Sequence, residues 1–334
     1  MALKVGVIGV GMIGQDHIRR LSTVLAGSTV VAVTDVDAER ASAVAAGIPG
    51  ARHHATGQSL IDAPQVEAVL VTSWGPSHED YCVAAIRAGK PVFCEKPLAT
   101  TQDACLRIID AERAAGRRLL QLGFMRRYDA AYRALKSTVA SGAIGTPLIM
   151  HSAHRNASVP PHYTSDMAIV DTAVHDIDIA RWLFDDEVAE TMVVAPRKSS
   201  RGGVLDDPLV MLLRMAAGAL VDVEITVNIA YGYDIRGEIV GETGVATMAE
   251  TAPVLVKREG SFSGRVPEDW RERFVRAYDV ELQEWVDNCA KGTVEGPSSW
   301  DGYAATAVTD AGLAAMKTGG WVKVQLRDKP ALYA

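Results

Sequence analysis

The sequence predicts an α/β protein in two parts: an N-terminal Rossmann doubly wound sheet, and a C-terminal α+β domain with a large, mostly antiparallel open sheet. In the first third of the chain, short apolar runs alternate with longer helical patterns, as parallel strands covered by helices do. After Phe124, strand-like runs separated by turn signals dominate. The 334 residues also exceed the size of most single cores. We therefore expect one domain at 1–123 and a second at 124–334.

The N-terminal elements alternate strictly. A strand at 5–8 leads through a glycine turn into a helix at 14–25. Further strands are expected at 30–34, 68–72, 92–94 and 119–123, and further helices at 38–46, 79–88 and 101–115. Each strand is short and apolar on both faces, which predicts a buried position in a parallel sheet.

The C-terminal part opens with a helix at 128–141, which ends at Gly142. Strands are expected at 147–156, 188–196, 209–215, 220–228 and 235–241, and helices at 167–184, 270–290 and 300–317. Turn signals between several strands favour an open, largely antiparallel sheet. Residues 258–269, with their glycines, serines and Pro267, predict an irregular excursion that borders the pocket or a subunit contact.

The composition argues against several functions. The net charge of −7 is unlike that of a nucleic-acid-binding surface. No apolar run approaches the ~18 residues of a membrane span, and glycines interrupt the N-terminal apolar stretch too early for a signal peptide. The four cysteines have neither zinc-site spacing nor the density of a disulfide scaffold. We therefore expect a cytoplasmic location, no metal, and neither a membrane nor a nucleic-acid partner.

The residues GVGMIG at 9–14 form a GxGxxG sequence between a predicted strand and a predicted helix. Glycines there permit a tight turn and let the backbone approach a pyrophosphate at the helix N-terminus. The second strand ends at Asp35, 21 residues after Gly14, where a carboxylate binds ribose hydroxyls and repels a 2′-phosphate. This favours NAD over NADP, although Arg40 lies downstream and is able to tolerate a phosphate.

Lys96 lies in the sequence Glu95-Lys96-Pro97 after the fourth strand, at the sheet edge where ligands bind. A lysine there is able to hold a substrate hydroxyl and stabilise alkoxide charge, and a cis Lys96–Pro97 bond is a plausible way to aim it. The same pattern is also typical of an ordinary solvated lysine.

Two polar groupings follow in the second domain. In the helix at 167–184, spacing places Asp171, His175 and Asp178 on one side, so that an imidazole beside carboxylates is able to take a hydroxyl proton. The alternative is a surface helix with a polar face. In the strand at 148–156, Ser152, His154 and Asn156 share one face and suit a ligand with many hydroxyls, or the solvated face of a sheet.

Together these segments resemble the Gfo/Idh/MocA oxidoreductases, which are sugar and polyol dehydrogenases. The similarity rests on VGVIGVGMIG at 5–14, EKP at 95–97 and the helix that carries Asp171 and His175. Further stretches resemble the members that oxidise inositols: VTSWGP at 71–76, GFMRRYD at 123–129, HRN at 154–156 and YGYDI at 231–235.

The resemblance implies NAD-dependent oxidation of a secondary hydroxyl of a cyclic polyol, with myo-inositol converted to 2-keto-myo-inositol. It implies that His175 is the acid/base, that Lys96 lowers the hydroxyl pKa and that Asp171 orients the substrate. It places near the cofactor Gly9, Gly11, Met12, Ile13, Gly14, Asp35, Ser73, Trp74, His78 and Glu95. It places in the polyol pocket Met125, Arg126, His154, Asn156 and Tyr233, and it predicts a homotetramer packed through the open sheets.

Three alternatives remain open at the level of sequence. The same chemistry is able to act on scyllo- or chiro-inositol, glucose or an anhydrosugar. A regulator that senses NAD without turnover is the second alternative, although an acid/base set has no use in a pure binder. The third is a non-redox enzyme, such as a glycosidase, that uses tightly held NAD transiently.

Overall fold

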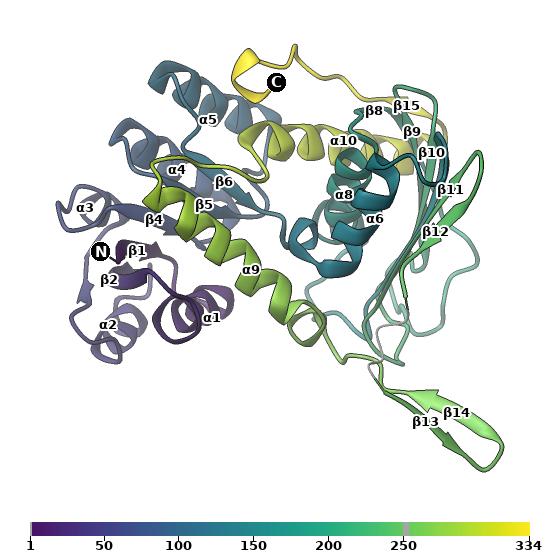
Figure 1. Cartoon of the computed structure of the whole chain (residues 1–334), viewed down its shortest axis with the longest axis horizontal. Coiled ribbons are helices and arrows are strands. Elements are labelled where there is room, and N and C mark those ends of the chain that lie inside the picture. The colour runs from purple at the N-terminus through teal and green to yellow at the C-terminus, as the bar shows by residue number, and fades with distance from the viewer. Residues whose placement is uncertain (1, 250–253) are drawn as a thin grey trace. The chain divides into compact units, whose positions relative to one another are not determined.

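The computed structural model describes residues 2–249 and 254–334. The described chain divides into two compact units (Figure 1). Unit 1 contains the residues up to Phe124, together with Tyr278–Thr306 and Arg327–Ala334. Unit 2 contains Ala307–Leu326 and the described residues of Met125–Ala277.

Unit 1 is built on a six-stranded parallel sheet. The strands are β1 (Leu3–Ile8), β2 (Ser28–Thr34), β3 (Arg52–His53), β4 (Ala68–Val71), β5 (Val92–Glu95) and β6 (Leu120–Gly123). Their order is β3-β2-β1-β4-β5-β6, and every neighbouring pair is parallel. This is the strand order of a dinucleotide-binding Rossmann sheet, with its switch point between β1 and β4. The predicted N-terminal fold is confirmed.

The connecting helices of unit 1 are α1 (Met12–Arg19), α2 (Ala38–Ala46), α3 (Gly57–Ile61), α4 (His78–Arg87) and α5 (Gln102–Ala115). A π-helical turn, Arg20–Val24, extends α1, and a 3-10 turn, Gly75–Ser77, precedes α4. All residues of β4, β5 and β6 are buried, as the continuous apolar runs predict for strands covered on both faces.

A late chain segment completes the core of unit 1. Leu282, Trp285 and Val286, from helix α9 (Trp270–Ala290), pack in one cluster with the apolar residues of β1 and β2. The division predicted from the sequence assigns all of 124–334 to the second domain. In the structure, Tyr278–Thr306 and Arg327–Ala334 instead belong to unit 1, with the Rossmann sheet. The difference arises because α9 buries Leu282, Trp285 and Val286 in the core of the first sheet, and because the buried Tyr333 hydrogen-bonds to Glu112 of α5.

Unit 2 contains a seven-stranded sheet in the order β12-β11-β7-β10-β9-β8-β15. Its strands are β7 (Pro147–Arg155), β8 (Val188–Val194), β9 (Leu209–Met215), β10 (Leu220–Thr226), β11 (Asp234–Gly241), β12 (Val245–Thr247) and β15 (Val322–Lys323). Only β10 and β7 pair in parallel; the other neighbours in the described sheet are antiparallel. The predicted mostly antiparallel sheet is confirmed.

Helices α6 (Ala130–Ala140) and α8 (Val174–Phe184) lie over one face of this sheet (Figure 1). The helix predicted at 167–184 is instead composite: α7 (Ser165–Met167), a π-helical segment (Ala168–Ala173) and then α8. Helix α10 (Ser299–Thr318) contributes its first residues to unit 1 and its last to unit 2.

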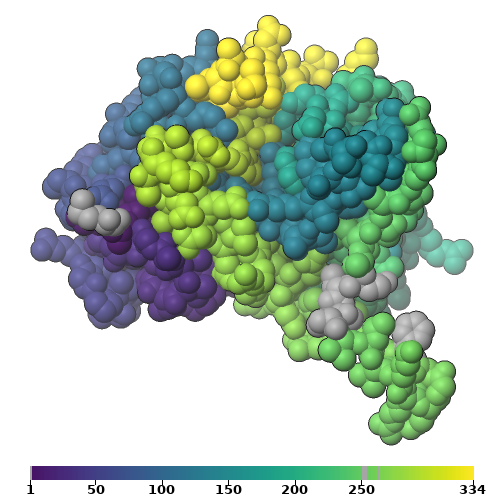
Figure 2. Space-filling view, in the orientation of Figure 1, coloured from purple at the N-terminus to yellow at the C-terminus, as the bar shows by residue number. Residues whose placement is uncertain are grey.

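The segment at 258–269 is more regular than the sequence suggests. Most of it belongs to a two-stranded hairpin, β13 (Leu255–Arg258) and β14 (Ser261–Gly264), which stands clear of the seven-stranded sheet (Figure 2). Farther along, the Pro267 carbonyl accepts a 2.7 Å hydrogen bond from the backbone nitrogen of Tyr233. Among the described helices, none has both the length and the apolarity needed to cross a membrane.

Candidate active site

A cavity of about 630 Å³ opens in unit 1 at the carboxyl ends of β1, β2 and β4. This is the switch point at which ligands bind in open α/β sheets. The lining includes seven of the predicted cofactor residues: Gly9, Gly11, Met12, Ile13, Asp35, Ser73 and Trp74. It also includes Arg40, Thr56 and Tyr81.

Two glycines of the first loop are required by close backbone approach. Gly9 has φ +93°, and a Cβ there would lie 2.5 Å from the Ser73 nitrogen. A Cβ at Gly14 would lie 2.1 Å from the Gly9 carbonyl oxygen. At Gly11, by contrast, an added Cβ meets no atom within 4 Å, and no side chain caps the N-terminus of α1. The loop therefore leaves open space before uncapped helix N–H groups, which fits the pyrophosphate of a dinucleotide.

Asp35 is held as an anion at the end of β2. It accepts hydrogen bonds from the Val10 nitrogen at 2.7 Å, the Asp37 nitrogen at 2.9 Å and the Arg40 guanidinium at 2.7 Å. Burial opposes its ionisation, but these hydrogen bonds outweigh it and lower the pKa of Asp35. A fixed carboxylate here suits ribose hydroxyls and disfavours a 2′-phosphate.

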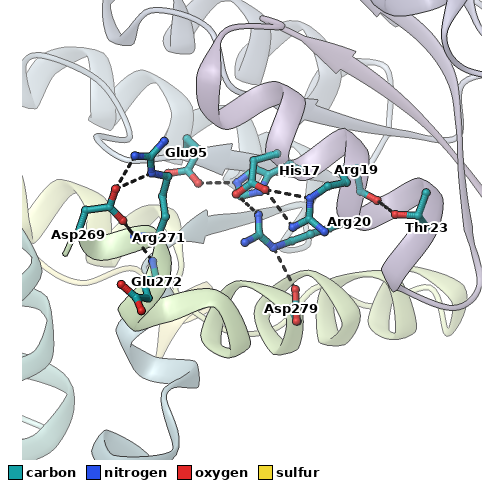
Figure 3. A network of polar contacts seen from close by, with 10 residues as sticks. His17, Arg19, Arg20, Thr23, Glu95, Asp269, Arg271, Glu272 and Asp279 are labelled. Atoms are coloured by element: carbon teal, nitrogen blue, oxygen red, sulfur yellow. Dashed lines mark hydrogen bonds and ion pairs between the residues drawn. The ribbon is translucent and has the colours of Figure 1, made fainter. Parts of the chain in front are cut away.

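Lys96 follows β5 in unit 1, and the Lys96–Pro97 peptide is cis, as the sequence analysis suggests. Its backbone nitrogen donates to Glu95 Oε2 at 3.1 Å. The other Glu95 oxygen lies 2.8 Å from Nε2 of the buried His17 (Figure 3). His78 is 1% exposed and contacts the carbonyl oxygens of Pro97 and Ser73. His78 and Glu95 are thus not among the residues that line the cavity.

A buried polar cluster forms in unit 2 around Asp176 of α8. The Asp176 carboxylate accepts hydrogen bonds from Arg126 at 2.7 Å, from Ser152 Oγ at 2.8 Å and from His154 Nδ1 at 2.8 Å. Burial opposes ionisation of Asp176, but the charges of Arg126 and His154 and these hydrogen bonds hold its pKa well below its ordinary value. The carboxylate is therefore an anion that fixes Arg126 and His154 in place.

The hydrogen bond to Asp176 sets the tautomer of His154. Nδ1 lies within reach of both Asp176 and Arg126, but it cannot donate to one and accept from the other. Donation to the anionic Asp176 is the stronger interaction, so Nδ1 carries a proton; in the neutral form of the ring Nε2 is then the nitrogen with the lone pair, and it lies 3.4 Å from the Tyr233 hydroxyl. The ring of His175 lies 6.4 Å from that of His154, centroid to centroid.

Family models cover most of the chain. Residues 3–124 match the model described as oxidoreductase family, NAD-binding Rossmann fold. Residues 136–324 match the model described as oxidoreductase family, C-terminal alpha/beta domain. The chain belongs to the Gfo/Idh/MocA oxidoreductase family.

Several relatives within the Gfo/Idh/MocA family match over the full length. Inositol 2-dehydrogenase 3 of Saccharopolyspora erythraea is 54% identical, with 100% of this chain and 98% of the relative covered. Inositol 2-dehydrogenase of Pseudomonas syringae pv. syringae is 53% identical over 100% of both chains. The crystal structure of myo-inositol dehydrogenase from Lactobacillus casei in complex with NAD(H) and myo-inositol is 38% identical, covers 100% of both chains and has a TM-score of 0.98.

The remaining predicted residues of this Gfo/Idh/MocA protein lie in unit 2. Met125 and Tyr233 are buried, Asn156 follows the end of β7, and Asp171 lies half-buried in the π-helical segment. Because Asp171 lies in a segment that is not α-helical, the spacing argument for a shared face applies to His175 and Asp178 within α8 but does not extend to Asp171. Asp178 is buried and forms an ion pair with Arg127, with a 2.9 Å contact to its Nε.

Sequence reasoning missed Asp176, the centre of the unit 2 cluster. A signal was available, because Asp176 is a carboxylate between apolar helix positions, and a buried carboxylate needs partners. The sequence also left open whether Ser152 and His154 lie on a ligand-binding face or on the solvated face of the sheet. Both are buried, so the solvated-face alternative is wrong for these two residues.

Proposed function

We propose that this protein is an NAD-dependent dehydrogenase that oxidises a secondary hydroxyl of a cyclic polyol, with myo-inositol converted to 2-keto-myo-inositol. The observation that carries the proposal is the full-length likeness, at a TM-score of 0.98, to an enzyme bound to both NAD(H) and myo-inositol. Relatives named inositol 2-dehydrogenase, identical to this chain at more than half of all positions, support the same substrate.

The cofactor contacts belong to unit 1. Gly9, Gly11, Met12, Ile13 and Gly14 receive the pyrophosphate at the start of α1, and Asp35 binds the adenosine ribose. Ser73 and Trp74 complete the wall, while His78 and Glu95 support it from buried positions. The bound NAD supplies a hydride acceptor.

Three side chains carry the proton chemistry. His175 accepts the hydroxyl proton of the substrate as general base. Lys96 places its ammonium at the reacting oxygen and stabilises the developing alkoxide, a role that a metal ion fills in other alcohol dehydrogenases. Asp171 orients the substrate through an adjacent hydroxyl.

The polyol pocket is assigned to Met125, Arg126, His154, Asn156 and Tyr233. The structure favours a rigid donor and acceptor set there, because Asp176 locks Arg126 and His154. Burial raises the pKa of Tyr233, so its hydroxyl stays protonated and remains a donor. Preorganised polar groups of this kind discriminate among polyol stereoisomers, since a misplaced hydroxyl leaves a buried group unpaired.

The protein is proposed to act in the cytoplasm as a homotetramer packed through the open sheet face of unit 2. Half-buried Met192 and Leu212 lie on that face beside the ion pair of His151 and Asp222. Light scattering after size exclusion tests the assembly: about four times the chain mass of 35.7 kDa supports it, and a monomer contradicts it.

The activity is tested by following NADH formation with myo-inositol, scyllo-inositol, chiro-inositol and glucose, each with NAD and with NADP. Strong turnover of myo-inositol with NAD is expected, and Lys96→Met is expected to abolish turnover while NAD still binds. If only another polyol is turned over, that polyol replaces myo-inositol as the proposed substrate. No turnover with NAD bound would favour a regulator, and turnover without net NADH release would favour transient use of NAD.

A further inference from the structure

We propose that two buried histidines of unit 1, His17 and His78, are positioning residues that clamp the Lys96 loop and couple it to the cofactor cavity. This inference rests on the proposed function for Lys96. Neither histidine lines the cavity, and each reaches a different end of the Glu95-Lys96-Pro97 segment.

The first arm runs from α1 through Glu95 to Lys96. His17 Nε2 lies 2.8 Å from Glu95 Oε1 (Figure 3). The other carboxylate oxygen, Glu95 Oε2, accepts the Lys96 backbone N–H at 3.1 Å. His17 is fully buried, and its ring packs edge-on against Phe93 with 6.0 Å between centroids. Its Nδ1 has no hydrogen-bond partner among the described residues, so Glu95 is the polar contact that accounts for an imidazole here.

Space for this arm is provided by Gly123 at the end of β6. A Cβ at Gly123 would lie 3.1–3.3 Å from the three carboxylate atoms of Glu95. The Glu95 carboxylate therefore fits closely against Gly123. One of its oxygens contacts His17 of α1, and the other accepts the backbone N–H of Lys96.

The second arm runs from the cofactor wall to Pro97. His78 Nε2 lies 2.9 Å from the Ser73 carbonyl oxygen, and Nδ1 lies 2.7 Å from the Pro97 carbonyl oxygen. Both partners are acceptors, so the protonated ring donates to both and the neutral ring to one. Ser73 in turn packs against Gly9, at a distance that excludes any Cβ.

The two arms join the glycine loop and the cofactor wall to the backbone on both sides of the Lys96 side chain. A shift of the cavity wall is therefore transmitted to the lysine through hydrogen bonds rather than through flexible packing. A displacement of a reacting group by about 1 Å lowers the reaction rate on the order of 100-fold.

Matched substitutions separate the arms. Gln places its amide nitrogen where His has Nε2, and Asn places its nitrogen where His has Nδ1. His17→Gln keeps the donor to Glu95, and His17→Leu removes it. His78→Gln keeps the Ser73 arm, and His78→Asn keeps the Pro97 arm. Cys94→Ala is the packing control. Cys94 Sγ lies 3.4 Å from His78 Nδ1, but Cys94 is not part of the hydrogen bonds that join His78 to Ser73 and Pro97.

Steady-state kinetics with the polyol that the wild type oxidises gives the first readout. We expect His17→Leu and His78→Gln to lower kcat about 10- to 100-fold, with the KM for NAD within about threefold. His78→Asn should raise the KM for NAD about tenfold and leave kcat within about threefold. His17→Gln and Cys94→Ala should retain kcat. Equal loss of kcat in His17→Gln and His17→Leu, or in both His78 variants, overturns the clamp.

Hydrogen exchange of the Lys96 amide, measured by mass spectrometry without substrate, gives the second readout. The amide should exchange at least about tenfold faster in His17→Leu than in His17→Gln or the wild type. Equal exchange in all three overturns the first arm. A wild type that oxidises no polyol would refute the proposed function, yet this measurement would still decide whether the lysine loop is clamped.

Discussion

Asp35 carries the cofactor preference at the level of a single side chain. We expect Asp35→Ser to raise the KM for NAD about tenfold or more, because hydrogen bonds to a charged group contribute about 1.5–3 kcal/mol. The same change frees Arg40, its ion-pair partner, for a 2′-phosphate, so the ratio of kcat/KM for NADP to that for NAD should rise. The exposed neighbour Glu39→Ser is the control, and an equal change in that variant would count against Asp35.

Asp176 is expected to link stability to pH. Its pKa is lower in the folded protein than in the unfolded chain, so it stabilises the fold above about pH 4 and loses that contribution as the pH falls further. Asp176→Asn should destabilise unit 2 by about 3–5 kcal/mol at neutral pH, because it leaves Arg126 buried without its anion.

The measurement for Asp176 is thermal unfolding between pH 3 and pH 7. The variant should lose less stability below about pH 4 than the wild type does, since its amide does not titrate. Asp110→Asn, at an exposed surface ion pair, should follow the wild-type pH profile. If Asp176→Asn lost as much stability as the wild type below about pH 4, Asp176 would not be the group that links stability to pH.

At the residue scale, the cofactor site could be predicted because its signals are local in sequence: a glycine loop, and an acid at the end of the next strand. The substrate cluster could be predicted only in part. His154 and Arg126 have sequence motifs, but Asp176 acquires its importance from partners 22, 24 and 50 residues away. No spacing rule connects those positions before the sheet and α8 are packed together.

At the scale of the element, two glycines at the start of α1 differ in the space available for a Cβ: Gly14 has none, whereas Gly11 has open space. Gly14→Ala should destabilise unit 1 by several kcal/mol, because the new Cβ meets the Gly9 carbonyl oxygen at 2.1 Å. Gly11→Ala should fold normally, since its Cβ enters open space, but should raise the Kd for NAD as the methyl fills the pyrophosphate position. Thermal unfolding and NAD titration test both variants, and equal stability of the two would contradict the packing argument.

The ends of long elements with many buried apolar residues could be predicted closely. The strand expected at 209–215 has the bounds of β9, Leu209–Met215, and the helix expected at 167–184 ends with α8 at Phe184. The short strands β3 and β13 were missed because all their residues are exposed, so burial imposes no apolar pattern on them. The π-helical segment was missed because residue spacing alone does not separate it from an α-helix.

At the scale of the whole molecule, Glu112 joins three distant parts of unit 1. Its buried carboxylate accepts hydrogen bonds from the Leu119 and Leu120 nitrogens, the Ser299 hydroxyl and the Tyr333 hydroxyl. Tyr333→Phe should lower the free energy of unfolding by about 1 kcal/mol, and Glu112→Leu by more, because several buried donors then lose their acceptor. Urea unfolding measures both changes, and an unaffected Glu112→Leu variant would rule out this anchor.

The three-segment construction of unit 1 also sets an order of events during synthesis. The residues up to Phe124 leave the ribosome without Leu282, Trp285 and Val286, which complete their core. At about 5–20 residues per second, the interval between Phe124 and Leu282 lasts roughly 8 to 30 s. Throughout that interval the part of the core that Leu282, Trp285 and Val286 later fill stays uncovered, so we expect the nascent chain to expose an apolar surface to chaperones until α9 has been synthesised.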